Sequence, residues 1–370
     1  LLTMLLGVLI FIDDYFNCLT VGAVMRPVTE SHKISRAKLA YLIDATAAPV
    51  CMIAPVSSWA AAVSGYVQSD AVNGIEMFIK QIPWNYYCLL TLVMIVVLSV
   101  MNIDYGSMLT HEYNAQVKDD LFTTPERPFE GADDYEKPAR GHSSVLDLLL
   151  PVVVLIVVCI VSLIWSGGYY DGESEYFHDF VGAFSNSSSG MALALGGLMG
   201  MLFTVVYAMA GAGDLKVFLP AVIFLIGCAI GFATGTSWGT IGIMAPIVVS
   251  VFNYDVEPVL CTIGLAAACS GGVMGDHCSP ISDTTIMASA GAHCFHLNHV
   301  FTQLPYALTA SGVAFVSFII AGLVQSVWLC LAIAVALMIG TLLVIRAIVS
   351  RRHAGIFQEM AQASQQLLHR

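Results

Sequence analysis

The chain carries, inside an apolar run, the stretch Gly271-Gly272-Val273-Met274-Gly275-Asp276-His277-Cys278-Ser279-Pro280-Ile281-Ser282-Asp283-Thr284-Thr285. Glycines let a chain leave a helix, and Pro280 lacks an N–H and bends one. This pattern predicts two half-helices joined by an unwound segment, with free carbonyls beside hydroxyl groups and two carboxylates. Such backbone is tolerated at membrane depth only when it is buried in protein or lines a wet cavity. The stretch therefore predicts a broken membrane-spanning helix with a polar centre.

The composition of the whole chain is that of a membrane protein. Of its 370 residues, 58% are hydrophobic and 11% charged, and the mean hydropathy is +0.80. Soluble domains carry roughly 25% charged residues. A soluble fold cannot hide this much apolar surface, whereas a lipid bilayer solvates it directly. We therefore expect the lipid bilayer as a partner.

Several functional classes are excluded by what the sequence lacks. The net charge of −12 comes mostly from two acidic loops, and no basic patch suits nucleic acid. There is no P-loop, nucleophile elbow or metalloprotease motif, so we expect neither an enzyme nor a bound cofactor. Transport would then have to be driven by ion gradients.

Apolar runs of about 20 residues predict about nine crossings. Four of the runs are interrupted by Gly, Pro, Ser, Thr and Asp, and two of these are too long for one helix. We expect an all-α polytopic membrane protein with broken helices and re-entrant hairpins. The predicted spans are 1–25, 38–63, 86–103, 144–166, 189–211, 215–250, 258–290, 301–322 and 326–346, of which 1–25, 38–63, 215–250 and 258–290 are interrupted.

This span count predicts the domain organisation and the orientation. A first membrane half (1–103) is followed by a polar, proline-containing linker loop (104–143), a second half (144–346) and a tail (347–370). Lys80 is then the only Lys or Arg on one side, so the opposite side, with the tail, is predicted to be cytoplasmic. We expect a plasma (inner) membrane protein. Because the chain starts within an apolar run, we also expect it to begin part-way through a longer protein.

A short similarity between the two halves favours an inverted-repeat transporter fold. Ser58-Trp59 and Ser237-Trp238 each lie in a span that also contains an Ala-Pro pair, although the order of the two pairs differs. Repeats of this kind are common in secondary transporters, where broken helices meet near the midplane.

The ionisable side chains within the spans are almost all aspartates, and no Lys or Arg lies deep in any span. A buried carboxylate is costly unless it is paired, hydrated, protonated or bound to a cation. Without a basic partner, the remaining options are water, a proton or a metal ion, which are the states of a cation/proton exchanger. The alternative is that each aspartate caps a half-helix or lies in a wet vestibule. The residues concerned are Asp13, Asp14, Asp44, Asp276, His277 and Asp283.

The carboxylates of Asp276 and Asp283 are the predicted sodium ligands. Sodium is a hard cation that prefers oxygen, and an unwound segment supplies it. Ser282-Asp283 could instead form the N-cap of the following half-helix. His277 is interpreted as a structural histidine. Hydroxyl ligands are predicted at Ser279, Ser282, Thr284 and Thr285, and, from the segment 232–240, at Thr234, Thr236, Ser237 and Thr240, where the alternative is a helix contact made by small residues.

The first half carries a second group of candidates. Adjacent aspartates point about 100° apart on a helix, so Asp13 and Asp14 should not share one role: one faces the ion and the other caps or is hydrated. The helical spacing of His293, His296 and His299 would suit a transition metal, but their predicted place in a cytoplasmic turn argues against it. The other candidates in this half are Asn17, Asp44, Thr46, Ser57 and Ser58.

Several long motifs together resemble the NhaC family of sodium/proton antiporters, in the expected order and up to about residue 322. They are Phe11-Ile12-Asp13-Asp14-Tyr15-Phe16-Asn17, Met25-Arg26-Pro27-Val28-Thr29, Lys33-Ile34-Ser35-Arg36-Ala37-Lys38-Leu39-Ala40-Tyr41, Thr46-Ala47-Ala48-Pro49-Val50, Gly235-Thr236-Ser237-Trp238-Gly239-Thr240 and the segment 275–285.

The resemblance implies a member of the ion transporter superfamily, with broken helices and re-entrant hairpins around a midplane site. Family members usually have spans before the Phe-Ile-Asp-Asp-Tyr motif, which are absent here. The implied function is exchange of Na⁺ for H⁺. Because the family includes malate–lactate exchangers, a sodium- and proton-coupled organic-anion exchanger is the alternative, and a channel or structural subunit is the third reading. The oligomeric state stays open, a homodimer included.

Overall fold

The computed structural model describes residues 1–67, 72–127, 213–252 and 254–368, and in these ranges every regular element is a helix. The described parts before and after the central gap belong to one compact unit. The predicted spans 144–166 and 189–211 and residues 128–143 of the linker loop lie outside the described residues, whereas the first part of that loop contains a helix, Ser107–Lys118.

The first half is a series of short helices. They are α1 (Leu2–Leu9), α2 (Asp14–Ser31), α3 (Arg36–Asp44), α4 (Ala48–Cys51), α5 (Ser58–Tyr66), α6 (Gly74–Gln81), a 3-10 turn (Ile82–Trp84), α7 (Tyr86–Met101) and α8 (Ser107–Lys118).

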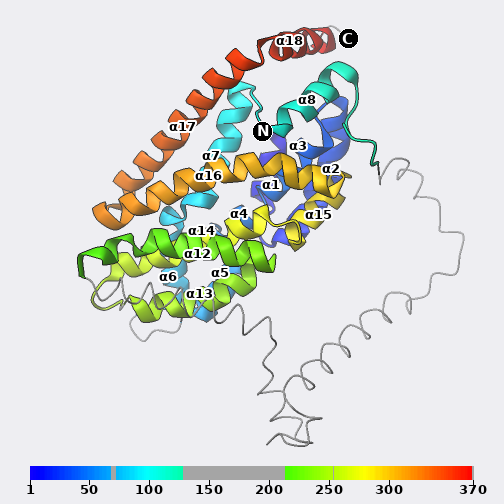
Figure 1. Ribbon diagram of the computed structural model, residues 1–370. Helices are drawn as coiled ribbons and strands as arrows, with labels where there is room; N and C mark the ends of the chain where they lie inside the picture. The colour runs from blue at the N-terminus through cyan, green and yellow to red at the C-terminus, as the bar shows by residue number, and fades with distance from the viewer. Residues whose placement is uncertain (68–71, 128–212, 253, 369–370) are drawn as a thin grey trace, which may run out of the picture. The chain divides into compact units, whose positions relative to one another are not determined.

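The second half has longer helices (Figure 1). A 3-10 segment (Gly213–Phe218) leads into α12 (Leu219–Thr234), α13 (Ser237–Val251), α14 (Pro258–Cys278), α15 (Asp283–Gly291), α16 (His296–Val324), α17 (Val327–Arg352) and α18 (Ala354–Leu368).

Within the described residues, four helical stretches are long and apolar enough to cross a membrane: Lys216–Thr234, Pro258–Cys278, His296–Val324 and Val327–Arg352. A fifth candidate joins Gly74–Trp84 to Tyr86–Met101 across a 45° bend. The prediction of a polytopic helical membrane protein is thereby confirmed. The third span is longer than the predicted 86–103 because the turn at Pro83 bends the helical path without ending it.

All four predicted interruptions are confirmed. Helices stop at residues 10–13 in the first span, at 45–47 and 52–57 in the second, at 235–236 in the sixth, and at 279–282 in the seventh. The local causes are visible in the backbone. Gly235 ends α12 with a φ of 65°, a left-handed conformation that glycine adopts without strain. Ser57 and Ser282 cap the next half-helices by accepting the N–H of Ala60 and Thr285.

The interior is built around α14, whose residues from Leu260 to the end of the helix are all buried. Glycines allow α12 to approach it closely: a Cβ at Gly275 would lie 2.3 Å from the Cys228 carbonyl oxygen, and one at Gly271 2.4 Å from that of Phe224. Such contacts between small residues are typical of membrane helix pairs. The backbones of α12 and α14 are thus in close contact near the turn that carries Asp276.

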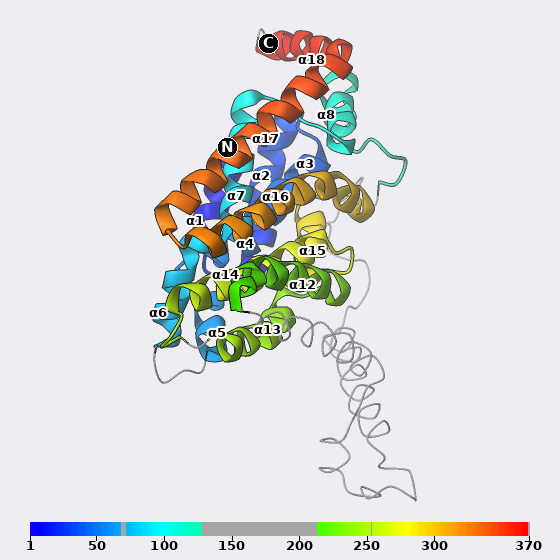
Figure 2. The same ribbon diagram turned by 60° about the vertical axis from the view of Figure 1, so that its left-hand side comes forward.

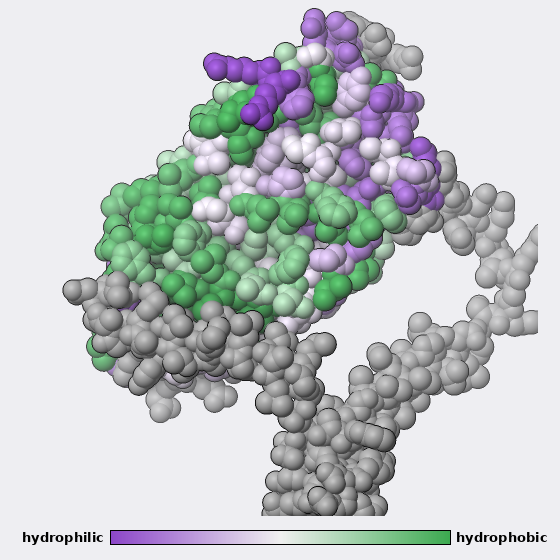
Figure 3. Space-filling view, in the orientation of Figure 1, coloured by the Kyte–Doolittle hydropathy of each residue, from purple (hydrophilic) through white to green (hydrophobic). Residues whose placement is uncertain are grey.

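The outer surface separates apolar from polar regions. Figure 3 shows apolar side chains over α16 and α17, and hydrophilic ones near α8 and α18. On α17, Trp328, Leu343 and Val344 are at least half exposed. Figure 2 shows α18 beside α8 at this polar end, where Tyr113 donates a hydrogen bond to Glu359. A lipid-facing band next to a polar end is the pattern expected of a bilayer-spanning bundle.

Candidate functional site

The breaks of the sixth and seventh spans meet at Asp276. The Ser237 hydroxyl, in the first turn of α13, donates to Asp276 Oδ2 at 2.5 Å, and both side chains are buried. The Ser279 hydroxyl donates to the Phe232 carbonyl at 2.9 Å, which ties the seventh break to the end of α12. Asp276 Oδ1 has no hydrogen-bond partner among the described residues. One carboxylate oxygen is therefore held in place while the other makes no hydrogen bond, although the Ser282 side chain interacts with this carboxylate.

Asp283 joins the two halves of the chain. Its Oδ2 accepts the Tyr15 hydroxyl of α2 at 2.6 Å, and its Oδ1 accepts the Thr284 N–H at 2.8 Å. The capping role that the sequence left as an alternative falls to Ser282, with Asp283 as the first residue of α15. A negative charge there is favoured by the helix dipole.

Asp13 and Asp14 have different roles, as predicted. Asp13 caps α2 by accepting the Phe16 N–H at 2.9 Å. Asp14 is only 1% exposed, and its Oδ1 finds no hydrogen-bond partner in the described part of the chain. The Trp59 indole interacts with Asp14 electrostatically but does not reach hydrogen-bond geometry. Asp14, rather than Asp13, is therefore the carboxylate that faces the interior.

Three carboxylates converge around Tyr15. Asp14 and Asp276 each interact electrostatically with Asp283, and Tyr15 interacts with all three. The ion pairs among the described residues include none of the three. The two groups of aspartates that lie in separate halves of the sequence thus interact electrostatically. We define Asp14, Asp276 and Asp283 as the acidic centre, although the described residues do not bring three carboxylates close enough to hold one metal ion.

Asp44 lies in a different environment. Its Oδ2 accepts the Thr285 hydroxyl at 3.0 Å and lies 3.2 Å from His299 Nε2 and 3.9 Å from His277 Nε2. The expectation that no basic partner is available to the membrane aspartates is therefore wrong for Asp44. The reason is that α14 and α16 bring two imidazoles to the end of α3. His299 was missed as a partner, although a His within a long apolar helix is a usable signal.

The three spaced histidines do not converge. His293 contacts Arg26, His296 contacts Ser289 and the Pro280 carbonyl, and His299 contacts Asp44. The described ranges contain no cluster of three His, Cys, Asp or Glu side chains able to hold a metal ion. His277 also has a second partner, because its Nδ1 lies 2.6 Å from the Tyr87 hydroxyl.

Polar residues of the first half hold the breaks in shape. The Asn17 amide donates to the carbonyls of Gly7 (2.7 Å), Ile10 (2.9 Å) and Thr46 (3.2 Å), so one side chain ties two breaks together. The Thr46 hydroxyl donates to the Leu42 carbonyl, and Ser57 donates to that of Cys51. The Ser58 hydroxyl oxygen is buried without a hydrogen-bond partner among the described residues.

The hydroxyls predicted as ligands in the second half mostly have local bonds. Thr234 donates to the Ile230 carbonyl and Thr240 to the Thr236 carbonyl, both at 2.8 Å. Thr236 precedes α13 without making a side-chain cap bond. Thr284 pairs with Ser282 at 3.2 Å. Their assignment as ion ligands stays a prediction.

The Ser-Trp pairs of the two halves are in contact. Trp59 and Trp238, each in the first turn of its helix, stack with ring centroids 4.0 Å apart and an interplanar angle of 25°. The sequence similarity of the two pairs therefore corresponds to a contact between the halves, which sequence alone did not predict.

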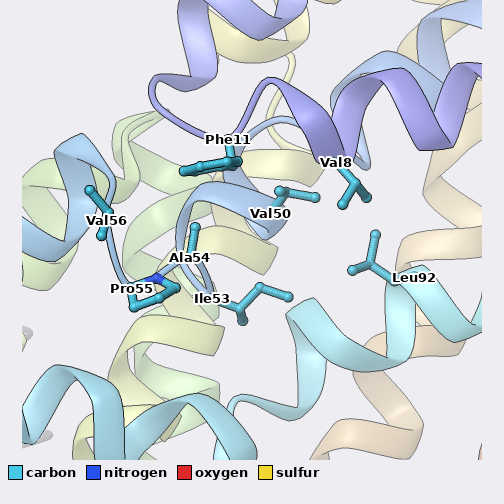
Figure 4. Close-up of a pocket in the computed structure, with 8 residues that line it drawn as sticks. All are labelled: Val8, Phe11, Val50, Ile53, Ala54, Pro55, Val56 and Leu92. Atoms are coloured by element: carbon cyan, nitrogen blue, oxygen red, sulfur yellow. The ribbon is translucent and has the colours of Figure 1, made fainter.

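An apolar cavity of about 330 Å³ lies beside the breaks of the first two spans (Figure 4). It contains none of the carboxylates of the acidic centre. Its lining residues are Val8, Phe11, Val50, Ile53, Ala54, Pro55, Val56 and Leu92.

Comparison with known proteins identifies the class. The sequence model of the Na⁺/H⁺ antiporter family matches residues 50–215 and 205–323. An uncharacterized protein of Haemophilus influenzae is 33% identical over 373 residues, covering 85% of this chain and 69% of that protein. No solved structure matches.

Two more distant relatives are antiporters by name. The malate-2H⁺/Na⁺-lactate antiporter of Bacillus subtilis is 34% identical over 99 residues, 26% of this chain and 21% of that protein. The arginine/ornithine antiporter ArcD of Halobacterium salinarum is 23% identical over 219 residues, 53% of this chain and 45% of that protein.

The helical bundle with broken spans is that of a multi-pass membrane transporter, not of an enzyme. The chain belongs to the Na⁺/H⁺ antiporter family, and the resemblance to its sodium/proton antiporters is confirmed.

Proposed function

We propose that this protein exchanges Na⁺ for H⁺ across the plasma membrane, with its C-terminal tail in the cytoplasm. The observation that carries the proposal is the acidic centre itself. Its three carboxylates come from helix breaks in both halves of the chain, and the described ion pairs leave all three without a basic partner. Carboxylates so placed need a proton or a cation to offset the loss of hydration.

Three buried oxygen atoms without described hydrogen-bond partners suggest how Na⁺ and H⁺ compete. Asp14 Oδ1, Asp276 Oδ1 and the Ser58 hydroxyl oxygen are buried and lack partners in the described ranges. Sodium prefers oxygen ligands of this kind, and a proton neutralises the same carboxylates. If one ion must leave before the other binds, and the occupied centre is exposed to the two sides in turn, the result is antiport.

The first test measures exchange in inverted membrane vesicles of a host lacking its own sodium/proton antiporters. A respiration-driven proton gradient quenches a pH-sensitive dye, and added sodium should restore the fluorescence. Asp276→Asn should abolish the response, since the amide keeps the shape but loses the charge. Asp119→Asn, an exposed acid that pairs with Lys33, is the control and should respond like the wild type. Absence of a sodium response in wild-type vesicles would sink the proposal.

A second candidate is sodium- and proton-coupled exchange of organic anions. The match to the Bacillus subtilis malate-2H⁺/Na⁺-lactate antiporter favours it. The N-termini of the half-helices α13 and α15 at the breaks could hold a carboxylate group. Vesicles preloaded with malate should then take up labelled lactate in a sodium-dependent manner, whereas simple Na⁺/H⁺ antiport predicts no such uptake.

A further inference from the structure

The stacked tryptophans occupy equivalent positions in two helices that lie side by side, α5 and α13 (Figures 1 and 2). Trp59 is 1% exposed and Trp238 is half-buried. Neither indole N–H makes a hydrogen bond with a described residue. The rings are therefore held mainly by their mutual stacking and by packing, with the interaction between Trp59 and Asp14 as the one polar contact described for either ring.

One side of the stack adjoins the acidic centre. Trp59 interacts with Asp14, and it follows Ser58, whose hydroxyl oxygen is buried without a described partner. Trp238 follows Ser237, which donates to Asp276. The pair thus touches the surroundings of two of the three carboxylates, one from each half of the chain.

Further along the same two helices, a cavity of about 450 Å³ lies between their C-terminal parts. Between the stack and this cavity, Gly242 lies close enough to the Tyr66 ring that an added Cβ would be 3.4 Å from it. The described residues that line the cavity are Gly65, Tyr66, Pro246, Val249 and Ser250.

We propose that Trp59 and Trp238 form the gate that closes the acidic centre toward the cavity between α5 and α13. This inference rests on the proposed function, because an antiporter must keep its site closed on one side while it is open on the other. Because no described hydrogen bond holds either indole N–H, the rings can separate and close again without breaking one. Stacked aromatic pairs stabilise a contact by an amount that corresponds to about a tenfold change in an equilibrium.

The direct test is chemical accessibility behind the gate. Ser58→Cys is labelled in vesicles with a membrane-impermeant thiol reagent, and the labelled peptide is quantified by mass spectrometry, which separates it from the native cysteines. Trp238→Leu keeps apolar volume but cannot stack, and we expect it to raise the labelling rate about tenfold. Trp238→Phe keeps an aromatic ring and should leave the rate near that of Ser58→Cys alone. Trp328→Leu, at an exposed tryptophan of α17, is the matched control.

The second measurement is how tightly proton movement is coupled to sodium movement. With the gate lost, we expect sodium-independent proton leak to rise in Trp59→Leu and in Trp238→Leu. The double variant should leak no more than either single one, because either change removes the same stack. The result that would overturn the gate is an unchanged labelling rate in both leucine variants, or equal rates for the leucine and phenylalanine variants.

The labelling assay needs no transport. If wild-type vesicles show no Na⁺/H⁺ exchange while labelling still rises in the leucine variants, the proposed function fails and the gate stands. If exchange is present and labelling does not change, only the gate is wrong. Should Trp238→Leu fail to reach the membrane, Trp59→Leu against Trp59→Phe, with the same reporter cysteine, makes the same comparison from the other helix.

Discussion

Asp13 and Asp14 lie next to each other at the start of α2. Substitutions at these two positions can therefore distinguish the loss of a carboxylate of the acidic centre from the loss of a helix cap. Asp14 is 1% exposed and has an oxygen without a described partner, whereas Asp13 accepts the Phe16 N–H. Replacing either by asparagine keeps the shape and removes the charge. The two substitutions should nevertheless have different consequences, because only Asp14 faces the interior.

The expected changes in exchange activity and in the free energy of unfolding follow from the environments of the two aspartates. An aspartate at the centre of a membrane helix costs about 2.5–3.5 kcal/mol, which is an upper bound for Asp14 because it begins α2 at a helix break. The interaction of Asp14 with Trp59 offsets part of that cost. We therefore expect Asp14→Asn to abolish exchange and to raise the free energy of unfolding by about 1–3 kcal/mol. Asp13→Asn should change stability by only a few tenths of a kcal/mol, because asparagine caps as well as aspartate, whereas Asp13→Ala should lose about 1 kcal/mol.

The assay combines sodium-dependent dequenching in inverted vesicles with thermal unfolding of the purified protein in detergent. Activity and stability should move in opposite directions for Asp14→Asn and together, if at all, for the Asp13 variants. Exchange at the wild-type rate in Asp14→Asn would refute the assignment of Asp14. A loss of exchange in Asp13→Asn as complete as in Asp14→Asn would show that capping and ion binding are not separated in this way.

Two further predictions concern stability. Gly275→Ala should lower the free energy of unfolding by about 1–3 kcal/mol, because its Cβ would meet the Cys228 carbonyl oxygen at 2.3 Å. Gly312→Ala, whose Cβ would have nothing within 4 Å, should be neutral or stabilising. Melting temperatures of the two variants in detergent test this difference. Burial in α8 raises the pKa of Glu112, against the opposing charge of Lys38, so the folded protein binds its proton more tightly than the unfolded chain. This contribution to stability is complete below the unfolded pKa, near 4.5, and is lost as the pH rises through the higher folded pKa. Glu112→Gln should therefore weaken the fall of the melting temperature as the pH rises above about 4.5.

The positions of the helix breaks could be read from sequence because their causes are local. Pro280 lacks an N–H, Gly235 takes up a left-handed conformation, and Ser57 caps the helix that follows it. Each effect acts within a few residues, so the pattern of residue types already contains it. The sequence predicted different roles for Asp13 and Asp14 from their angular offset on a helix, whereas in the structure the difference arises because Asp13 is an extended N-cap residue and Asp14 begins α2.

The partners of the membrane aspartates could not be read in this way. Tyr15 and Asp283 are 268 positions apart, and Asp44 and His299 are 255 apart. Nothing in the local pattern says which turn of one helix will lie against which turn of another. The sequence therefore grouped Asp276 with Asp283 and left Asp14 and Asp44 together, while the structure places Asp14 with the first pair and surrounds Asp44 with imidazoles.

The sequence by itself determined that this is a membrane transporter with broken spans, because apolar composition and helix-breaking residues act locally and additively along the chain. The tertiary structure alone decided that Asp14, Asp276 and Asp283 share one centre, that Asp44 has basic neighbours, and that Trp59 stacks on Trp238. These contacts depend on how closely α12 packs on α14 and how the two halves fit together. That fit is a property of the whole packed bundle, not of any segment within it.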